Sequence, residues 1–301
     1  MKRSDFLKLI ALAPLASQTM NMQAVSNIIN TLPSTKKMPV LFTSHGKPMD
    51  IPVPRNERAF WQKLYEVGID LKKNYDVKAA LVVSAHWCTK GTFVNISSDQ
   101  KQIFDYYGFP EEYYKVFYKA KGSPEIAHEV KKLVPSVSET TEWGLDHGAW
   151  PMLMHLFPDA NIPVFQLSID YYAKPEYHYE LGKQLKSLRS KGVLIIGSGA
   201  LIHNIPLAGQ KMHKNDMTPY GWELEYDSWI KQQIDNRNFS DIINYSSSHK
   251  LGKLAAPTPD HFVPVLYSLG LLDKGDEIKY FFEAEQKLPA FSERSFIVQE
   301  V

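Results

Sequence analysis

Short, continuous apolar runs alternate with amphipathic stretches along the chain, and this alternation limits the folds that the sequence can adopt. Four runs have the length and apolar character of buried parallel strands, at residues 38–43, 79–84, 162–168 and 193–198. Between them, residues 55–75 and 176–189 repeat apolar side chains at helical spacing. The pattern predicts an α/β fold, a single three-layer domain around a largely parallel central sheet with helices on both faces.

Other segments complete this scheme. Further helices are expected at residues 124–133, 149–157, 222–236 and 262–271, and loops at the proline-flanked residues 109–110 and 256–259. Beyond the first residues, no composition shift or low-complexity segment marks a linker. We therefore expect one catalytic domain over residues 38–301.

The first twenty residues differ from the rest of the chain. Lys2 and Arg3 precede an apolar stretch that ends near Ala16, which is typical of an export signal. Residues 3–8 resemble the twin-arginine signal, with Ser4 in place of the second arginine. The alternative is an amphipathic N-terminal helix on a cytoplasmic protein. A functional leader would make the protein periplasmic or exported, and the stretch is too short for a stable membrane anchor.

Charge and cysteine content narrow the function classes. With 34 Lys and Arg against 33 Asp and Glu, the formal net charge of +1 gives no basic field for nucleic acid, so a small-molecule partner is expected. The single cysteine, Cys88, excludes an internal disulfide and a cysteine-built zinc site, which leaves histidine and carboxylate as metal ligands. Cys88 is interpreted as a buried filler. The sequence does not indicate an oligomeric state.

Four histidines follow apolar runs of this kind: His45, His86, His203 and His261. Ligands of open α/β sheets bind at the carboxyl ends of the strands, where these side chains are expected to meet. His261 is expected at the start of a helix, with Asp260 or Thr258 as its cap. Because neutral imidazole is a common ligand of iron, zinc and copper, the pattern predicts a metal-dependent enzyme.

His147 has a different setting, between Trp143 and Trp150 and beside two glycines. This segment could wall a pocket for a flat aromatic molecule and supply an imidazole for proton transfer, or it could be a tight turn before a helix. Residues 105–110 form a second aromatic loop. The remaining histidines are expected to be surface or packing residues: His128, His155, His178, His213 and His249.

Five motifs, in this order, carry a family resemblance: Ser44-His45-Gly46-x-Pro48, Ser84-Ala85-His86-Trp87, Leu145-Asp146-His147-Gly148, Gly197-Ser198-Gly199 with His203-Asn204, and Pro257-Thr258-Pro259-Asp260-His261-Phe262. Together they resemble the class III extradiol ring-cleaving dioxygenases, specifically the DOPA 4,5-dioxygenase branch. The resemblance implies a mononuclear divalent metal, a catechol substrate such as DOPA, and insertion of both atoms of O2 next to the diol.

The same resemblance implies roles for individual residues. His45, His86 and His261 correspond to metal ligands, and His147 corresponds to a catalytic histidine near the substrate. His203 corresponds either to a further ligand or to the catalytic acid/base. In better-known relatives two histidines and a glutamate bind the metal, and here His261 takes the place of the carboxylate. An all-histidine site suits zinc as well as Fe(II), so we predict Fe(II) for activity and zinc as another occupant.

Two other functions are compatible with the histidine cluster. A zinc-dependent hydrolase would use a metal-bound hydroxide, although that function leaves the aromatic surroundings of His147 unexplained. A non-catalytic binding protein could also keep this fold. The exact catechol is not determined by the sequence. Position near the strand ends makes Lys47, Lys90 and Ser168 candidates for binding a substrate carboxylate.

Overall fold

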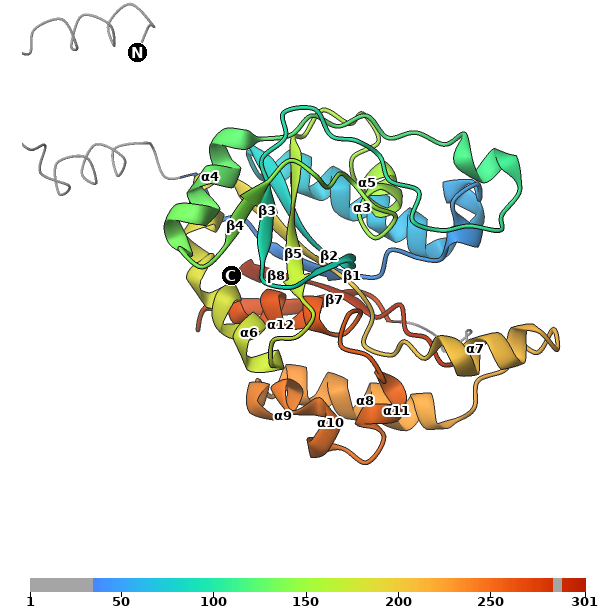
Figure 1. The fold of residues 1–301 in the computed structure, drawn as a ribbon. Coiled ribbons are helices and arrows are strands. Elements are labelled where there is room, and N and C mark those ends of the chain that lie inside the picture. Colours follow the sequence, from blue (N-terminus) through green and yellow to red (C-terminus); the bar gives the residue numbers. More distant parts are fainter. Residues whose placement is uncertain (1–34, 284–288) are drawn as a thin grey trace, which may run out of the picture. The chain divides into compact units, whose positions relative to one another are not determined.

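A computed structural model describes residues 35–283 and 289–301 (Figure 1). The predicted leader at residues 1–20 lies outside the described residues. Among those residues, no helix is both long and apolar enough to cross a bilayer.

The centre of the fold is an eight-stranded sheet with the strand order β4-β3-β5-β2-β6-β1-β8-β7. The strands are β1 (Val40–Thr43), β2 (Ala79–Thr89), β3 (Phe93–Asn95), β4 (Ser138–Thr140), β5 (Val164–Asp170), β6 (Val193–Ser198), β7 (Asp276–Phe282) and β8 (Ser295–Glu300). The four central strands β5, β2, β6 and β1 are parallel, and β8 and β7 continue the sheet antiparallel. The predicted parallel core is confirmed.

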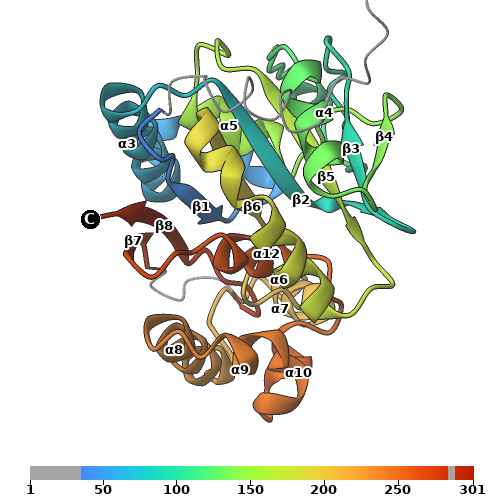
Figure 2. The ribbon, with the colours of Figure 1, turned by 90° about the vertical axis from the view of Figure 1, so that its left-hand side faces the viewer.

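Helices cover both faces of this sheet (Figures 1 and 2). The upper layer in Figure 1 contains α3 (Ala59–Asn74) and α5 (Trp150–Leu156), and the other face is covered by α4 (Pro124–Leu133), α6 (Pro175–Gln184) and α12 (Val263–Gly270). Beyond α6 and α12 lie α8 (Trp222–Asp235), α9 (Phe239–Ile243), α10 (Tyr245–Ser248) and α11 (Gly252–Ala255). The three predicted layers are therefore present, with an additional group of helices outside them.

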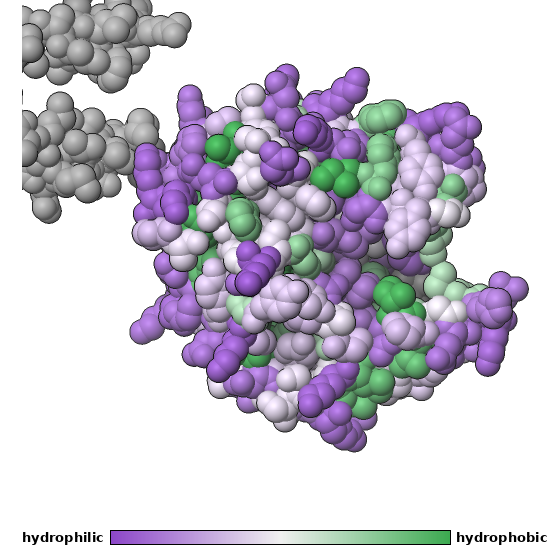
Figure 3. All heavy atoms as spheres, in the orientation of Figure 1, coloured by the Kyte–Doolittle hydropathy of each residue, from purple (hydrophilic) through white to green (hydrophobic). Residues whose placement is uncertain are grey.

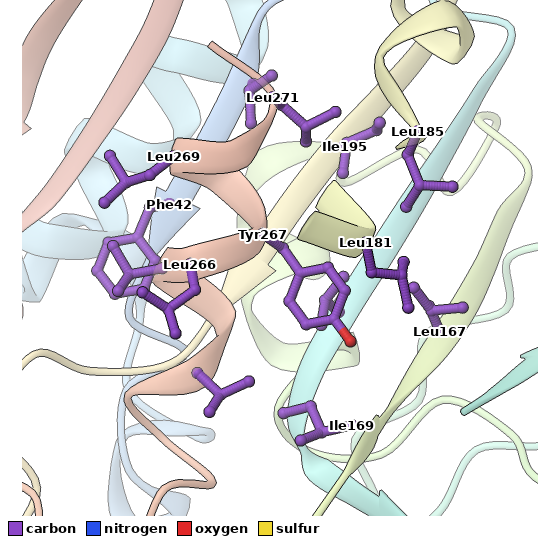
Figure 4. Packing of buried hydrophobic residues seen from close by; sticks show 14 of the residues in the cluster. Phe42, Leu167, Ile169, Leu181, Leu185, Ile195, Leu266, Tyr267, Leu269 and Leu271 are labelled. Carbon is purple, nitrogen blue, oxygen red and sulfur yellow. The ribbon is translucent and has the colours of Figure 1, made fainter. Parts of the chain in front are cut away.

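Alternate residues of the strands supply two separate cores. In β1, Val40 and Phe42 belong to the cluster with α12, whereas Leu41 belongs to the cluster with α3 and α5. Figure 4 shows Leu266 and Leu269 of α12 beside Phe42. A strand that buries both faces has no polar alternation, which is why these runs were recognisable in the sequence.

The edge strands were not predicted. This holds for β7, and also for its neighbour β8, with which it pairs antiparallel. Most residues of β7 are exposed or partly exposed, and in β8 only residues 296–298 form an apolar run, which is too short to be recognised as a strand. The helix expected at 176–189 is shorter than predicted: α6 ends at Gln184, and the 3-10 helix η4 (Lys186–Lys191) follows it. The interpretation of Cys88 as a buried filler is wrong. Its side chain is exposed, near the end of β2 where the strand leaves the core.

The buried His155 joins α5 to α3. Its ring stacks on Trp61 at a centroid distance of 4.4 Å, and its Nε2 atom has no hydrogen-bond partner among the described residues. Burial, with Arg55 and Arg58 nearby, lowers the pKa of His155 from 6.5 to about 4. This histidine is a packing residue, as the sequence indicates.

His155 should make folding sensitive to acid. Because its folded pKa lies below its unfolded pKa, its stabilising effect is complete above about pH 6.5 and is lost as the pH falls toward about 4. His155→Phe should remove this dependence. When the pH is lowered from about 7 to about 5, the unfolding free energy of the variant should therefore fall by about 2 kcal/mol less than that of the parent protein. Denaturant titrations at both pH values measure this difference. His213→Phe, at an exposed position, is the control. Equal losses in H155F and the parent would contradict the prediction.

Candidate metal centre and active site

The five predicted site histidines lie together at the carboxyl ends of the central strands. Ring-centroid distances are 4.9 Å for His45 and His86, 5.4 Å for His45 and His261, and 4.9 Å for His86 and His261. His147 lies 3.8 Å from His86, and His203 stacks on His261 at 3.4 Å. Residues separated by more than 200 positions thus share one site. Their proximity is as expected, and their individual roles remain predictions.

The nitrogen atoms that face one another are suitable metal donors. The Nε2 atoms of His45 and His86 lie 3.1 Å apart. Possible ligand atoms fall into two sets, each within 4.8 Å: His45, His86 and His147 in one, and His203, Asp260 and His261 in the other. The expected ligand set of His45, His86 and His261 therefore spans both sets.

The other ring nitrogen of each expected ligand already has a partner. Nδ1 of His45 lies 3.0 Å from Ser198 Oγ. Nδ1 of His86 lies 3.1 Å from Asp105 Oδ2, and Nδ1 of His261 lies 2.5 Å from Asp260 Oδ2. Metal-binding histidines commonly use one nitrogen for such a partner, which orients the other toward the ion. The donor set therefore fits a divalent metal.

Asp260 or Thr258 was expected to cap the helix that follows His261, and that expectation is wrong for both residues. α12 begins at Val263, and no side chain caps its first turn. The Asp260 carboxylate instead binds the neighbouring imidazole, because Nδ1 of His261 is within direct reach of it.

Asp105 is the functional residue that sequence reasoning missed. Its Oδ2 atom lies 2.8 Å from Nδ1 of His147 and 3.1 Å from Nδ1 of His86, and its Oδ1 atom accepts a bond from the His147 backbone N–H. Burial raises the pKa of the Asp105 carboxyl, but hydrogen bonds from His147 and His86 outweigh this and hold the pKa below its usual range. A lone aspartate in an aromatic loop carries no periodic signal that would have identified it.

The imidazoles themselves are kept neutral. Burial lowers the pKa of His45 and of His261 well below 6.5, and neighbouring histidines act in the same direction. Burial also lowers the pKa of His203, to about 4. A neutral imidazole has a free lone pair, so these side chains are available as ligands or proton acceptors at neutral pH.

Asp146 fixes the loop that carries His147. Its carboxylate accepts hydrogen bonds from Ser84 Oγ at 2.6 Å, Trp143 Nε1 at 2.9 Å and Gln166 Nε2 at 3.0 Å. The backbone then makes a tight turn into α5, since the N–H of Trp150 donates to the Asp146 carbonyl. The turn expected as one alternative is present.

The expected aromatic wall is not formed by the tryptophans. Trp150 is fully buried in the core, and Trp143 stacks on Trp87; neither lines the cavity. His147 does line it, together with the other four site histidines.

A cavity of about 340 Å³ opens beside the histidines, within the range of small-molecule sites. Its opposite wall is apolar and comes largely from α7 (Ile205–Met212) and the residues after it. The larger apolar side chains that line the cavity are Met49, Ile205, Met212, Met217 and Phe291. In Figure 3 the surface is indented above α7, and hydrophobic residues lie along the indentation. A flat aromatic ring with a short substituent can therefore reach the histidines.

The sequence is similar to a known protein family and to individual proteins with related names. Residues 39–291 match the family described as the catalytic LigB subunit of aromatic ring-opening dioxygenase. A 4,5-DOPA dioxygenase extradiol of Escherichia coli (strain K12) is 36% identical over 251 residues, covering 81% of this chain and 89% of the relative. The protein of the same name from Beta vulgaris is 37% identical over 235 residues, which cover 76% of this chain and 85% of the relative.

The fold is also similar to a solved structure. The crystal structure of an uncharacterized Escherichia coli K12 protein matches with a TM-score of 0.72 and 31% sequence identity. The match covers 86% of this chain and 99% of that chain.

Gly199 should be essential to the placement of His261. A Cβ atom built on Gly199 would lie 2.2 Å from the His261 carbonyl oxygen, and the Gly199 N–H bonds the Thr43 carbonyl at 3.0 Å. Gly199→Ala should displace His261 and lower the affinity for Zn²⁺ about 10-fold or more, because metal sites tolerate little distortion. Competition with a fluorescent zinc chelator measures this affinity.

Gly275→Ala is the matched control, because a Cβ atom there meets no neighbour within 4 Å. Unchanged zinc affinity in G199A, with the parent circular dichroism spectrum, would show that the contact does not position His261.

Proposed function

The chain belongs to the family of the catalytic LigB subunit of aromatic ring-opening dioxygenases, and on this basis we propose that His45, His86 and His261 hold its divalent metal. The family assignment makes the protein a metal-dependent extradiol dioxygenase that uses O2 and a small aromatic substrate. It does not favour the zinc hydrolase alternative. The observation that carries the ligand assignment is the convergence of three imidazoles whose Nδ1 atoms all have partners.

A bound divalent metal supplies Lewis acidity toward the diol and, when redox-active, electrons for the reaction with O2. We propose Fe(II) as the active metal. Zinc has no redox chemistry, and it generally binds such nitrogen sites more tightly than Fe(II) does. A zinc-loaded protein should therefore be stable and inactive in ring cleavage.

His147 is proposed as the residue that moves protons at the substrate. It lines the cavity, and Asp105 holds its Nδ1 atom, which leaves Nε2 as the atom that can accept a proton from the diol. The same carboxylate stabilises the imidazolium that would form, since the Asp105 oxygen lies 2.8 Å from Nδ1.

His203 is proposed as the second acid/base residue and not as a ligand. Its ring is nearly parallel to that of His261, with 8° between the planes and 3.4 Å between the centroids. An imidazole nitrogen directs its lone pair within the plane of its own ring, so two rings stacked in this way would not both direct a nitrogen at one metal held by His261. His203 also lines the cavity, where it can return a proton to the opening ring.

The proposed substrate is a catechol of the kind named in the relatives, 3,4-dihydroxyphenylalanine (DOPA). The cavity of about 340 Å³ has room for a single ring, and the histidines that line it suit a vicinal diol. Ring opening beside the diol would take up one O2 per catechol and give a coloured semialdehyde-type product.

Metal replacement tests this function directly. Protein stripped of metal and reloaded anaerobically with Fe(II) should consume O2 in equal amount to added L-DOPA, with growth of visible absorbance, because both oxygen atoms enter the product. The zinc-loaded form should do neither. An oxygen electrode and a spectrophotometer give both readings. Hydrolysis of a chromogenic ester by the zinc form, with no O2 uptake by the iron form, would overturn the proposal.

Removal of one ligand tests the assignment of His86. His86→Ala should lower metal affinity by more than about 100-fold, since loss of a mere supporting partner already costs about 10 to 100-fold. Turnover should disappear while the circular dichroism spectrum stays unchanged. Elemental analysis after gel filtration measures the retained metal. His213→Ala, at an exposed position that does not line the cavity, serves as the control. An H86A protein that keeps full metal content and activity would refute the assignment.

A further inference from the structure

We propose that Lys47 binds an anionic substituent of the catechol, so that the enzyme prefers substrates whose side chain ends in a carboxylate over substrates with an ammonium group. This inference rests on the proposed function and refines its substrate class. It concerns the residues that line the cavity without being expected metal ligands.

Lys47 supplies the positive charge of the cavity. It lies two residues after His45, on the loop between β1 and the 3-10 helix η1 (Pro48–Asp50). Among the described residues that line the cavity, it is the only lysine or arginine, and none is an aspartate or glutamate. An anionic group inside the cavity therefore meets one cation and no like charge from these residues.

The backbone of Lys47 is held on both sides. Its N–H donates to Asp50 Oδ2 at 3.0 Å, and its carbonyl accepts from the Asp50 N–H at 2.8 Å. Pro48 follows directly and restricts the chain further. The side chain thus starts from a fixed point beside the metal site, which reduces the conformational entropy lost when it binds a ligand.

The neighbouring acids are occupied by Arg58. Arg58 Nη2 lies 3.0 Å from Asp50 Oδ2 and also bonds Glu293 Oε1. Burial raises the pKa of Glu293, while Arg58 and Lys47 act in the opposite direction. Lys47 makes no ion pair within 4 Å with the described acidic residues, so its ammonium group is available to a ligand.

The remaining wall favours a hydrocarbon linker. Met49, Met212 and Met217 line the cavity, and methionine side chains adapt to apolar chains of different shape. An ammonium group on the substrate would lose water there without gaining a carboxylate partner from the described lining residues, and Lys47 would repel it. The carboxylate of DOPA can meet Lys47, whereas its ammonium group gains nothing at this wall.

The other two residues that the sequence offered for binding a substrate carboxylate, Lys90 and Ser168, do not line the cavity. Lys90 is exposed and does not line the cavity. Ser168 is fully buried and bonds Thr89 Oγ1 at 2.7 Å and the Phe93 N–H at 2.8 Å. Lys47 is the one that can contact a bound catechol.

Three catechols that differ only in the side chain test the proposal: 3-(3,4-dihydroxyphenyl)propionate, 4-propylcatechol and dopamine. With the Fe(II) enzyme, kcat/KM for the acid should exceed that for 4-propylcatechol about tenfold, and dopamine should be the poorest substrate. Lys47→Gln should remove the advantage of the acid and leave turnover of 4-propylcatechol nearly unchanged. Lys90→Gln, which alters a lysine outside the cavity, should keep the parent preference.

Charge reversal separates recognition from a structural role. Lys47→Glu should invert the order so that dopamine exceeds the acid, a result that simple distortion of the loop does not produce. Calorimetric titration of the zinc-loaded protein with the acid gives affinity without turnover, and Lys47→Gln should weaken it about tenfold. Lys47→Arg, which keeps the charge, should restore most of the affinity.

Failure of the inference differs from failure of the proposed function. If 4-propylcatechol is cleaved normally but the acid keeps its advantage in Lys47→Gln, the role of Lys47 is refuted and ring cleavage stands. If the parent protein with Fe(II) consumes no O2 with any of the three catechols, the proposed function itself is refuted. The ratio of the calorimetric affinities of the parent and Lys47→Gln for the acid then tests the role of Lys47 independently of turnover.

Discussion

The in-register parallel pairing of β1, β6 and β2 is the constraint on which the site depends. Thr43 of β1 and Ser84 of β2 both pair with Ser198 at the end of β6. Thr43 and Ser84 therefore lie at the same level of the sheet, and His45 and His86 each follow two residues later, His86 within the last part of β2, which continues to Thr89. A slip of one strand by one residue would turn its side chains to the other face and separate the two imidazoles. Burial of both faces of the sheet prevents such a slip, because it would move apolar residues out of both cores.

The chemistry of the site depends on how its charges are compensated. Neutral imidazoles, kept so by burial, surround the place where a cation would bind, and carboxylates stand behind them. Asp105 contacts both His86 and His147, so one carboxylate links an expected ligand to an expected proton carrier. This arrangement keeps negative charge near the metal without placing a carboxylate among its expected ligands. It is consistent with the expectation that His261 takes the place of a carboxylate ligand.

Much of this architecture could be predicted from the sequence, and the exceptions have physical causes. Buried parallel strands leave continuous apolar runs, and the ends of these runs in the sequence indicate His45 and His86. The edge strand β7 is partly exposed, and β8 has an apolar run of only three residues, so neither leaves such a signal. Contacts made by single residues across long separations, such as Asp105 with His147 or Ser198 with His45, have no local pattern at all. The sequence left the position of Trp150 open between a pocket wall and a turn before a helix, because a pocket wall and a core place the same demand on an aromatic side chain.

The cavity has two walls of different origin. The histidines come from the ends of the sheet and cannot be changed independently of its register, whereas the opposite wall comes largely from α7 and the residues that follow it. Mutations in that segment can therefore accumulate without disturbing the residues that perform the chemistry. A family built on this plan can acquire new aromatic substrates by drift in one short helix, while the reaction itself stays the same.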